Sequence, residues 1–385
     1  MEFDFGWLLL GLPLAFACGW IASRFDLRQW RSEARSAPKA YFKGLNYLLN
    51  EQQDQAIDAF IEAVQNDPDT TELHFALGNL FRRRGEYNRA VRVHEHLLSR
   101  ADLTRADRER AQHALALDFL KAGLLDRAED ALRRLEGTAF ETQARLALLA
   151  IYERSHDWPQ AMAIAERMQA AQQGDFSTRC AHYLCEQAQA QVMRGDVEAA
   201  RALLLQAAQC AASAPRPRLE LARLAQRQGE SDAALSGLFE LARVAPSALP
   251  LAAQLLADAA QASGRSSEAL ALLLRHYDEM PSLDLLDAIV ALESTQAGAA
   301  GGARERYVRH LEHEPSLVAA TRWLASETLS HEQYHPQVQR ALEQASKPLT
   351  RYRCAACGFE AHQHFWQCPG CQSWDSYPAR RVEEL

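Results

Sequence analysis

The feature that most constrains this 385-residue chain is a short pattern that recurs along its middle. A glycine is followed five residues later by an alanine at Gly85–Ala90, Gly123–Ala128, Gly195–Ala200, Gly229–Ala234 and Gly264–Ala269. Glycine can adopt the left-handed conformation that ends a helix, and alanine lets a second helix approach the first closely. Because the copies recur in phase, the pattern predicts an array of helix–turn–helix units.

A second set of residues supplies the apolar contacts of such a unit. Small and aromatic residues recur at tetratricopeptide-repeat spacing in Gly44, Tyr47, Ala56, Phe60, Ala63 and Pro68, and again in Leu77, Gly78, Phe81 and Ala90. A helix pair cannot bury its apolar stripe alone, so repeats stack into a superhelix with a concave groove. We therefore expect an all-α tetratricopeptide-repeat superhelix of about eight or nine helix pairs over residues 38–346, the last one or two degenerate. Such solenoids bind peptides or protein segments, but the groove residues that contact a ligand are unknown from the sequence.

The N-terminal segment predicts one transmembrane helix. Residues 5–23 carry no charge, and these 19 residues span roughly 28 Å as a helix. Four arginines follow, Arg24, Arg28, Arg31 and Arg35, so the positive-inside rule places the bulk of the chain in the cytoplasm. We expect a transmembrane helix over residues 1–23 and a basic juxtamembrane linker over 24–37. The acidic start disfavours a cleaved signal peptide and a lipoprotein acylated at Cys18.

Four cysteines near the C-terminus form a metal-binding pattern. They are Cys354, Cys357, Cys368 and Cys371, two CxxC pairs separated by ten residues. Four thiolates at this spacing can bind one metal ion tetrahedrally, and such a site suits either zinc or iron. We expect a small metal-dependent knuckle over residues 351–376 and a tail over 377–385. Its aromatic residues should pack against the knuckle itself or the last repeats; they are Tyr352, Phe359, Phe365, Trp366 and Trp374.

Charge and residue patterns disfavour several function classes. A formal net charge of −8 argues against nucleic-acid binding, which needs a basic surface. The scattered Cys180, Cys185 and Cys210 suit a reducing compartment, and the pair Cys180 and Cys185 suits buried packing. Histidines cluster at His94 with His96, His310 with His313, His331 with His335, and His362 with His364; we interpret them as surface residues because no further ligand completes a site. The sequence contains neither a phosphate-binding glycine loop nor a nucleophile elbow, so we expect no enzyme.

Taken over its whole length, the chain resembles the lipopolysaccharide assembly protein B family of Gram-negative bacteria. The stretches that carry the resemblance are residues 41–58, 77–98, 118–130, 181–188 and 351–375. The resemblance implies an inner-membrane, cytoplasm-facing adaptor that regulates lipid A synthesis by presenting the committed-step deacetylase to a membrane-bound AAA+ metalloprotease. It also implies association with lipopolysaccharide assembly proteins and an inner-membrane sensor protein, and a rubredoxin-type metal module with the four cysteines as ligands. The alanine-rich later repeats depart from the generic pattern, as at Ala225 and Ala260, where the first-helix aromatic is missing.

The sequence is compatible with two other hypotheses about function. An iron site could make the chain a redox protein whose repeats only dock partners. A repeat scaffold facing the periplasm would instead predict oxidised cysteines and the opposite topology. The sequence leaves open the metal in the cell, direct binding of lipopolysaccharide and whether the chain forms a homo-oligomer.

Overall fold

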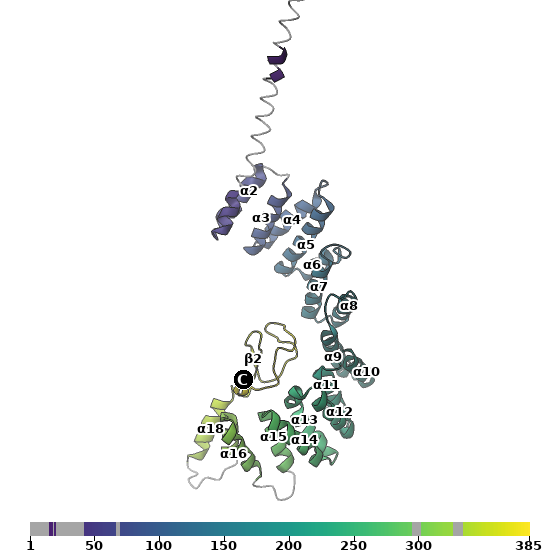
Figure 1. The fold of residues 1–385 in the computed structure, drawn as a ribbon, viewed down its shortest axis with the longest axis vertical. Coiled ribbons are helices and arrows are strands. Elements are labelled where there is room, and N and C mark those ends of the chain that lie inside the picture. The colour runs from purple at the N-terminus through teal and green to yellow at the C-terminus, as the bar shows by residue number, and fades with distance from the viewer. Residues whose placement is uncertain (1–14, 18, 21–41, 67–69, 295–301, 326–333) are drawn as a thin grey trace, which may run out of the picture. The chain divides into compact units, whose positions relative to one another are not determined.

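The structure is a computed structural model that describes residues 15–17, 19–20, 42–66, 70–294, 302–325 and 334–385 (Figure 1). The chain divides into two compact units, Met1–Ile151 and Tyr152–Leu385. Most of the predicted transmembrane helix and the whole predicted juxtamembrane linker lie outside the described residues. Within the described part, no helix has both the length and the apolar character that a membrane crossing requires.

The first unit is a run of antiparallel helix pairs. Residues 42–49 are helical and precede α2 (Gln53–Asn66), α3 (Thr71–Arg83), α4 (Tyr87–Ser99), α5 (Arg105–Ala122), α6 (Leu125–Arg133) and α7 (Glu141–Ser155), whose last residues belong to the second unit. Helices that are consecutive in sequence pack on each other from α2 through α6. A buried cluster that includes Phe60, Leu73 and Phe81 fills the space between the first pairs.

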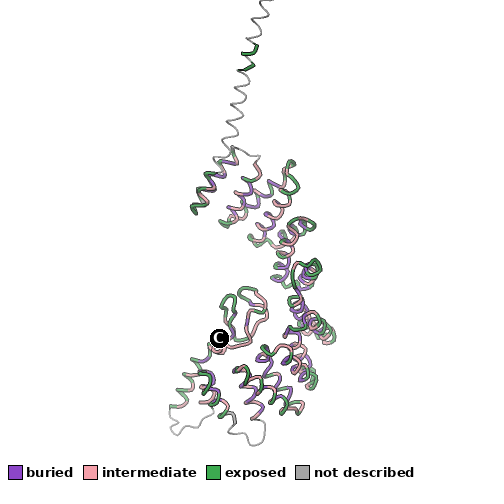
Figure 2. Tube along the Cα trace, in the orientation of Figure 1, coloured by how far each residue is buried: buried purple, intermediate pink, exposed green. Residues whose placement is uncertain are grey.

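The second unit continues the same architecture. Its helices are α8 (Trp158–Ala170), α9 (Ser177–Arg194), α10 (Val197–Cys210), α11 (Pro215–Arg227), α12 (Ser231–Val244), the 3-10 helix η1 (Pro246–Ala252), α13 (Ala253–Ala262), α14 (Ser266–Glu279), α15 (Leu283–Ser294), α16 (Gly302–His313), α17 (Leu317–Ala325) and α18 (His335–Ser346). Buried residues follow the lines where neighbouring helices meet (Figure 2). A buried cluster between α11 and α15 consists mainly of alanine and leucine, so small side chains and close helix approach replace the missing aromatics there.

The turns within the helix pairs have the predicted conformation. Gly195 follows α9 with φ of 83°, in the left-handed region where a β-carbon would be strained. The other four turn glycines also have positive φ, and the alanine five residues after each of the five glycines has no exposed surface. The equivalent position in the α7–α8 turn is His156, which takes the same conformation with φ of 57°. The all-α repeat prediction is confirmed.

The chain ends in a small module that is not helical. Strands β1 (Tyr352–Arg353) and β2 (Glu360–Ala361) pair antiparallel, with Tyr352 opposite Ala361. A single bridge between Gln367 and Trp374 closes a second loop. The last residues form the 3-10 turn η2 (Val382–Glu384).

Candidate metal centre

The four predicted cysteines lie on two loops with nearly the same backbone. In the first loop the amide of Gly358 donates to the carbonyl of Cys354, and in the second the amide of Gln372 donates to the carbonyl of Cys368, at 2.9 and 2.7 Å. Gly358 and Gln372 both have left-handed backbones, with φ of 78° and 62°. Each loop therefore turns back after its second cysteine, which brings its two sulfurs to the same side.

The sulfur positions fit a single tetrahedral ion. All four Sγ atoms lie within 4.8 Å of one another. Cys354 and Cys371 are 3.8 Å apart at sulfur, and Cys357 and Cys368 are 3.7 Å apart. A tetrahedron with metal–sulfur bonds of about 2.3 Å has edges of about 3.8 Å, so these four sulfurs could hold one metal ion.

The surroundings of the sulfurs differ on the two sides of the site. Cys354 and Cys368 are buried, whereas Cys357 and Cys371 are exposed. Cys371 Sγ lies 3.4 Å from Ser373 Oγ, and this hydrogen bond holds the pKa of the Cys371 thiol below its usual value. Hydrogen bonds to sulfur stabilise the thiolate form that a metal requires.

The second cysteine loop is anchored to the repeats of the same unit. The Trp374 ring stacks on His182 of α9 at 4.7 Å, and its indole nitrogen donates to Glu153 at 3.0 Å. Next to it, the Asp375 carboxylate accepts from His182 Nε2 at 2.9 Å. Glu153 also accepts from the hydroxyl of Tyr183. Because Trp374 and Asp375 follow Cys371 by only three and four residues, the position of the second cysteine loop depends on these contacts.

The repeat residues in this contact share one place in the repeat. His182 of α9 and Arg216 of α11 are 34 residues apart, both near the start of the first helix of a pair. Arg216 faces the ring of Trp366 at 5.9 Å and pairs with Glu186 at 2.6 Å. These are middle repeats, so the expectation that the module aromatics pack only on the module or the last repeats is wrong for Trp366 and Trp374. The contact of His182 with the module was not predicted from the sequence, although the 34-residue period could have placed His182 beside Arg216.

Comparison with known proteins gives this site and the rest of the chain a family. Residues 352–377 match the family model described as "Rubredoxin metal binding domain". The curated "Lipopolysaccharide assembly protein B" of Escherichia coli K12 is 32% identical over 392 residues, covering 98% of this chain and 99% of that protein. The chain belongs to the lipopolysaccharide assembly protein B family. A second relative of the same name, from Haemophilus influenzae, is 27% identical over 96% of each chain.

Among solved structures, a tetratricopeptide repeat protein from Parabacteroides merdae is similar to 67% of this chain. The match covers 99% of that protein, with 13% sequence identity and a TM-score of 0.34. The prediction of the family from the sequence is confirmed by the curated relatives.

Two histidines of the predicted surface clusters, His94 and His310, are buried. His94 is fully buried, and its Nδ1 contacts the buried Asp118 carboxylate, which also pairs with Arg82 at 2.8 Å. His310 is only 6% exposed. The interpretation of these two residues as surface histidines is therefore wrong. The repeat register holds the signal, because His94 lies 34 residues after Phe60 and packs against Gly78 as Phe60 packs against Gly44.

Proposed function

We propose that this chain is a membrane-anchored adaptor of lipopolysaccharide biosynthesis, acting by protein contacts and not by catalysis. The observation that carries the proposal is family membership across 98% of the chain, from the first repeats through the cysteine module. Stacked helix pairs offer an extended surface to other proteins, which is the usual role of such solenoids. The net charge of −8 disfavours nucleic acid as the partner.

We propose more specifically that the chain presents the committed-step lipid A deacetylase to a membrane-bound AAA+ metalloprotease. We also propose that it contacts lipopolysaccharide assembly and sensor proteins of the inner membrane. The resemblance of the sequence to the family supports these partners. A transmembrane helix over residues 1–23 would confine the repeats to the cytoplasmic face of the inner membrane. Confinement raises the effective concentration of the repeats toward another membrane protein without any new contact.

The anchor can be tested by deleting residues 1–23 in a strain that lacks the native gene. We expect the deacetylase to accumulate although the truncated chain folds, because the protease would meet the adaptor only by diffusion. A matched control replaces residues 1–23 with an unrelated transmembrane helix of the same orientation and should restore degradation. Full control of deacetylase abundance by the truncated soluble chain would contradict the mechanism.

We further propose that Cys354, Cys357, Cys368 and Cys371 bind one metal ion, iron or zinc, whose main role is to fold the module. The sulfur spacing supports a shared ion, and a module of this size has too little apolar core to fold alone. Metal analysis of purified chain, compared with a Cys357→Ser and Cys368→Ser double variant, should give about one ion per chain for the parent. Equal metal content in the two proteins would refute the site.

An iron-dependent redox role is the second candidate function. The exposure of Cys357 and Cys371 favours it, since an electron-transfer partner could approach the sulfurs directly. Replacing the metal with zinc, which has no redox chemistry, separates the two functions. We expect the zinc form to support normal deacetylase turnover in reconstituted membranes; loss of that activity with zinc would favour the redox role.

A further inference from the structure

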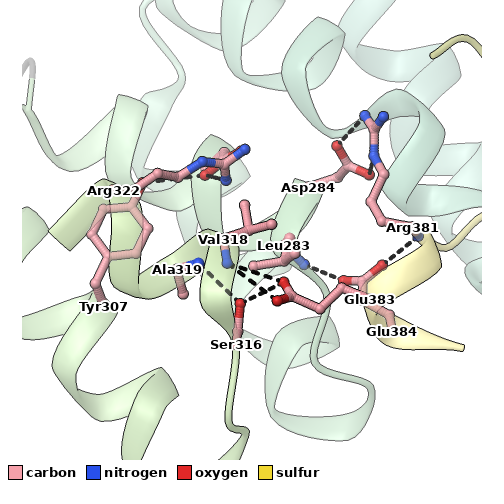
Figure 3. Close-up of polar contacts among 11 residues, drawn as sticks. Leu283, Asp284, Tyr307, Ser316, Val318, Ala319, Arg322, Arg381, Glu383 and Glu384 are labelled. Atoms are coloured by element: carbon pink, nitrogen blue, oxygen red, sulfur yellow. Dashed lines mark hydrogen bonds and ion pairs between the residues drawn. The ribbon is translucent and has the colours of Figure 1, made fainter. Parts of the chain in front are cut away.

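The C-terminal residues make an unusual pair of contacts with the last repeats. Glu383 and Glu384 are adjacent in the sequence, yet their carboxylates reach the N-terminal ends of two different helices, α17 and α15 (Figure 3). An N-terminal helix end presents unpaired amide groups and a partial positive charge, both of which favour an anion.

At α17, the Glu383 carboxylate accepts hydrogen bonds from three donors. One oxygen accepts from the amide of Leu317 at 2.5 Å, and the other accepts from the Ser316 hydroxyl at 2.7 Å. The amide of Val318 lies 3.2 and 3.3 Å from the two oxygens. Ser316 meanwhile accepts from the amide of Ala319 at 2.9 Å, so it caps the helix and binds the carboxylate at the same time.

At α15, the Glu384 carboxylate accepts from one amide at the helix end and from one amide of its own segment. One oxygen accepts from the amide of Leu283 at 2.5 Å, and the other from the amide of Arg381 at 2.7 Å. The hydroxyl of Ser282 is 2% exposed and has no hydrogen-bond partner among the described residues. Glu384 therefore satisfies the helix end that Ser282 leaves open.

The two helix ends are copies of one sequence. Pro281-Ser282-Leu283 and Pro315-Ser316-Leu317 are 34 residues apart, one repeat period. Their spacing is held by Asp287 of α15, which accepts from the hydroxyl of Tyr307 of α16 at 3.2 Å and pairs with Arg322 of α17. The repeats thus supply every donor to Glu383 and the Leu283 amide to Glu384, and the tail adds the amide of Arg381.

We propose that the N-terminal ends of α15 and α17 form a binding site for two adjacent carboxylates of an acidic peptide, and that the chain's own Glu383-Glu384 segment is its tethered ligand. The site selects carboxylates over amides because both oxygens of each glutamate accept hydrogen bonds. A glutamine would turn one of those oxygens into a donor that faces another donor. An acidic segment of another protein, with two neighbouring carboxylates, is the chemistry that would compete.

Occupation of this site also holds the metal module in place. Arg381 pairs with Asp284 of α15 at 2.8 Å and lies 4.1 Å over the ring of Tyr352 in β1. The amide of Val382 donates to the carbonyl of Arg351 at 2.7 Å, directly before β1. Release of the two glutamates would therefore loosen the contact between the tail and Arg351, the residue directly before β1 and the first cysteine loop.

Amide hydrogen exchange on the full chain in lipid nanodiscs tests the proposal, read at single residues by electron-transfer fragmentation. We expect Glu384→Gln to accelerate exchange of the Leu283 amide by about tenfold or more, and Glu383→Gln to do the same for the amides of Leu317 and Val318. The control is Glu305→Gln, an exposed glutamate of α16, which should change neither. Unchanged exchange at all three amides in the double variant would overturn the proposal.

A peptide in trans then tests whether the site takes a ligand. The probe is a synthetic peptide of residues 379–385, added at millimolar concentration to the full-length double variant Glu383→Gln and Glu384→Gln. We expect it to restore slow exchange at Leu283, Leu317 and Val318, while the same peptide with glutamine at both positions does not. Failure of the acidic peptide, or equal protection by the two peptides, would overturn the site. Equal metal content in parent and variant checks that the module remains folded.

Discussion

At the residue scale, the backbone conformation of a glycine decides what a larger side chain would cost. Gly195 and Gly237 both have open space where a β-carbon would lie. Only Gly195 has a left-handed backbone, at φ of 83°, whereas Gly237 lies inside α12. The same substitution should therefore have opposite effects at the two positions.

We expect Gly195→Ala to lower the free energy of unfolding by about 1–2 kcal/mol, because alanine is strained in the left-handed region. We expect Gly237→Ala to raise it by about 0.5–1 kcal/mol, since alanine loses less entropy in a helix. Chemical denaturation of the two variants and the parent measures both effects. A stabilising effect of alanine at residue 195 would contradict the predicted role of the turn.

Also at the residue scale, burial should make two of the cysteines unreactive toward alkylating reagents. Cys180 and Cys185 are 4% and 2% exposed, and burial raises the pKa of each thiol to about 12. The thiolate is the reactive form, so alkylation of these residues at pH 8 should be slower than that of an ordinary thiol by about three orders of magnitude.

Mass spectrometry after a short iodoacetamide pulse, in the presence of a chelator, measures this difference. We expect label at the exposed Cys371, whose pKa lies below its usual value, and almost none at Cys180 or Cys185. The same pulse in urea should label all of them. Rapid labelling of Cys185 in the folded chain would show that α9 opens more readily than its packing suggests.

At the element scale, the metal should control how the module sits on α9. The contacts of Trp374 and Asp375 with His182 follow the second cysteine loop directly. If the metal is removed by a chelator, we expect faster hydrogen exchange over residues 352–377 and around His182, with no change in α2–α6. Cys371→Ser should act like the chelator, and Cys210→Ser is the matched control. Unaltered exchange around His182 after metal loss would mean that the module docks without its metal.

The contact between α14 and α16 should be sensitive to acid. His310 of α16 accepts a hydrogen bond from Tyr277 of α14 at 2.6 Å, and burial lowers the pKa of His310. The unfolded chain therefore binds this proton more tightly, so the stabilising contribution is complete above about pH 6.5 and is lost as the pH falls through the folded-state pKa.

Denaturation of the parent at pH 7.5 and pH 5.5 should show this loss, with a slope of at most about 1.4 kcal/mol per pH unit for one proton. In His310→Gln the difference between the two pH values should shrink. A pH dependence that is the same in the two proteins would assign the acid effect to other groups. Glu314 and Glu383 act on His310 in the opposite direction, and His313 reinforces the shift.

At the scale of the whole molecule, a repeat array distributes stability locally. In the part of the chain that the structure describes, the most extensive helix contacts join neighbours in the array, and the two units have their own buried clusters. A cavity in one unit should therefore leave the other nearly unchanged.

Leu235 is fully buried in the second unit, so Leu235→Ala should destabilise that unit by about 2–5 kcal/mol. Hydrogen exchange should accelerate in α11–α15 and stay at the parent rate in α2–α4. Leu205→Ala, at an exposed position of α10, is the control. Equal acceleration in the two units would indicate that the chain unfolds as a single cooperative body.

Features that depend on local chemistry could be predicted from the sequence. The left-handed turn glycines, the buried alanines after them and the two cysteine loops follow from the sterics of a few neighbouring residues, so their spacing alone predicts them. The family could also be recognised from the sequence, because family-specific stretches recur along the whole chain.

Which distant residues meet depends on how the repeats stack. His182 and Asp375 are 193 residues apart, and Leu283 and Glu384 are 101 residues apart. No local pattern marks such pairs, because each partner is an ordinary polar residue until the stacking of the repeats brings it to the other. The repeat register could place His94 in the core, but its contact with the buried Asp118 carboxylate depends on how the helices stack.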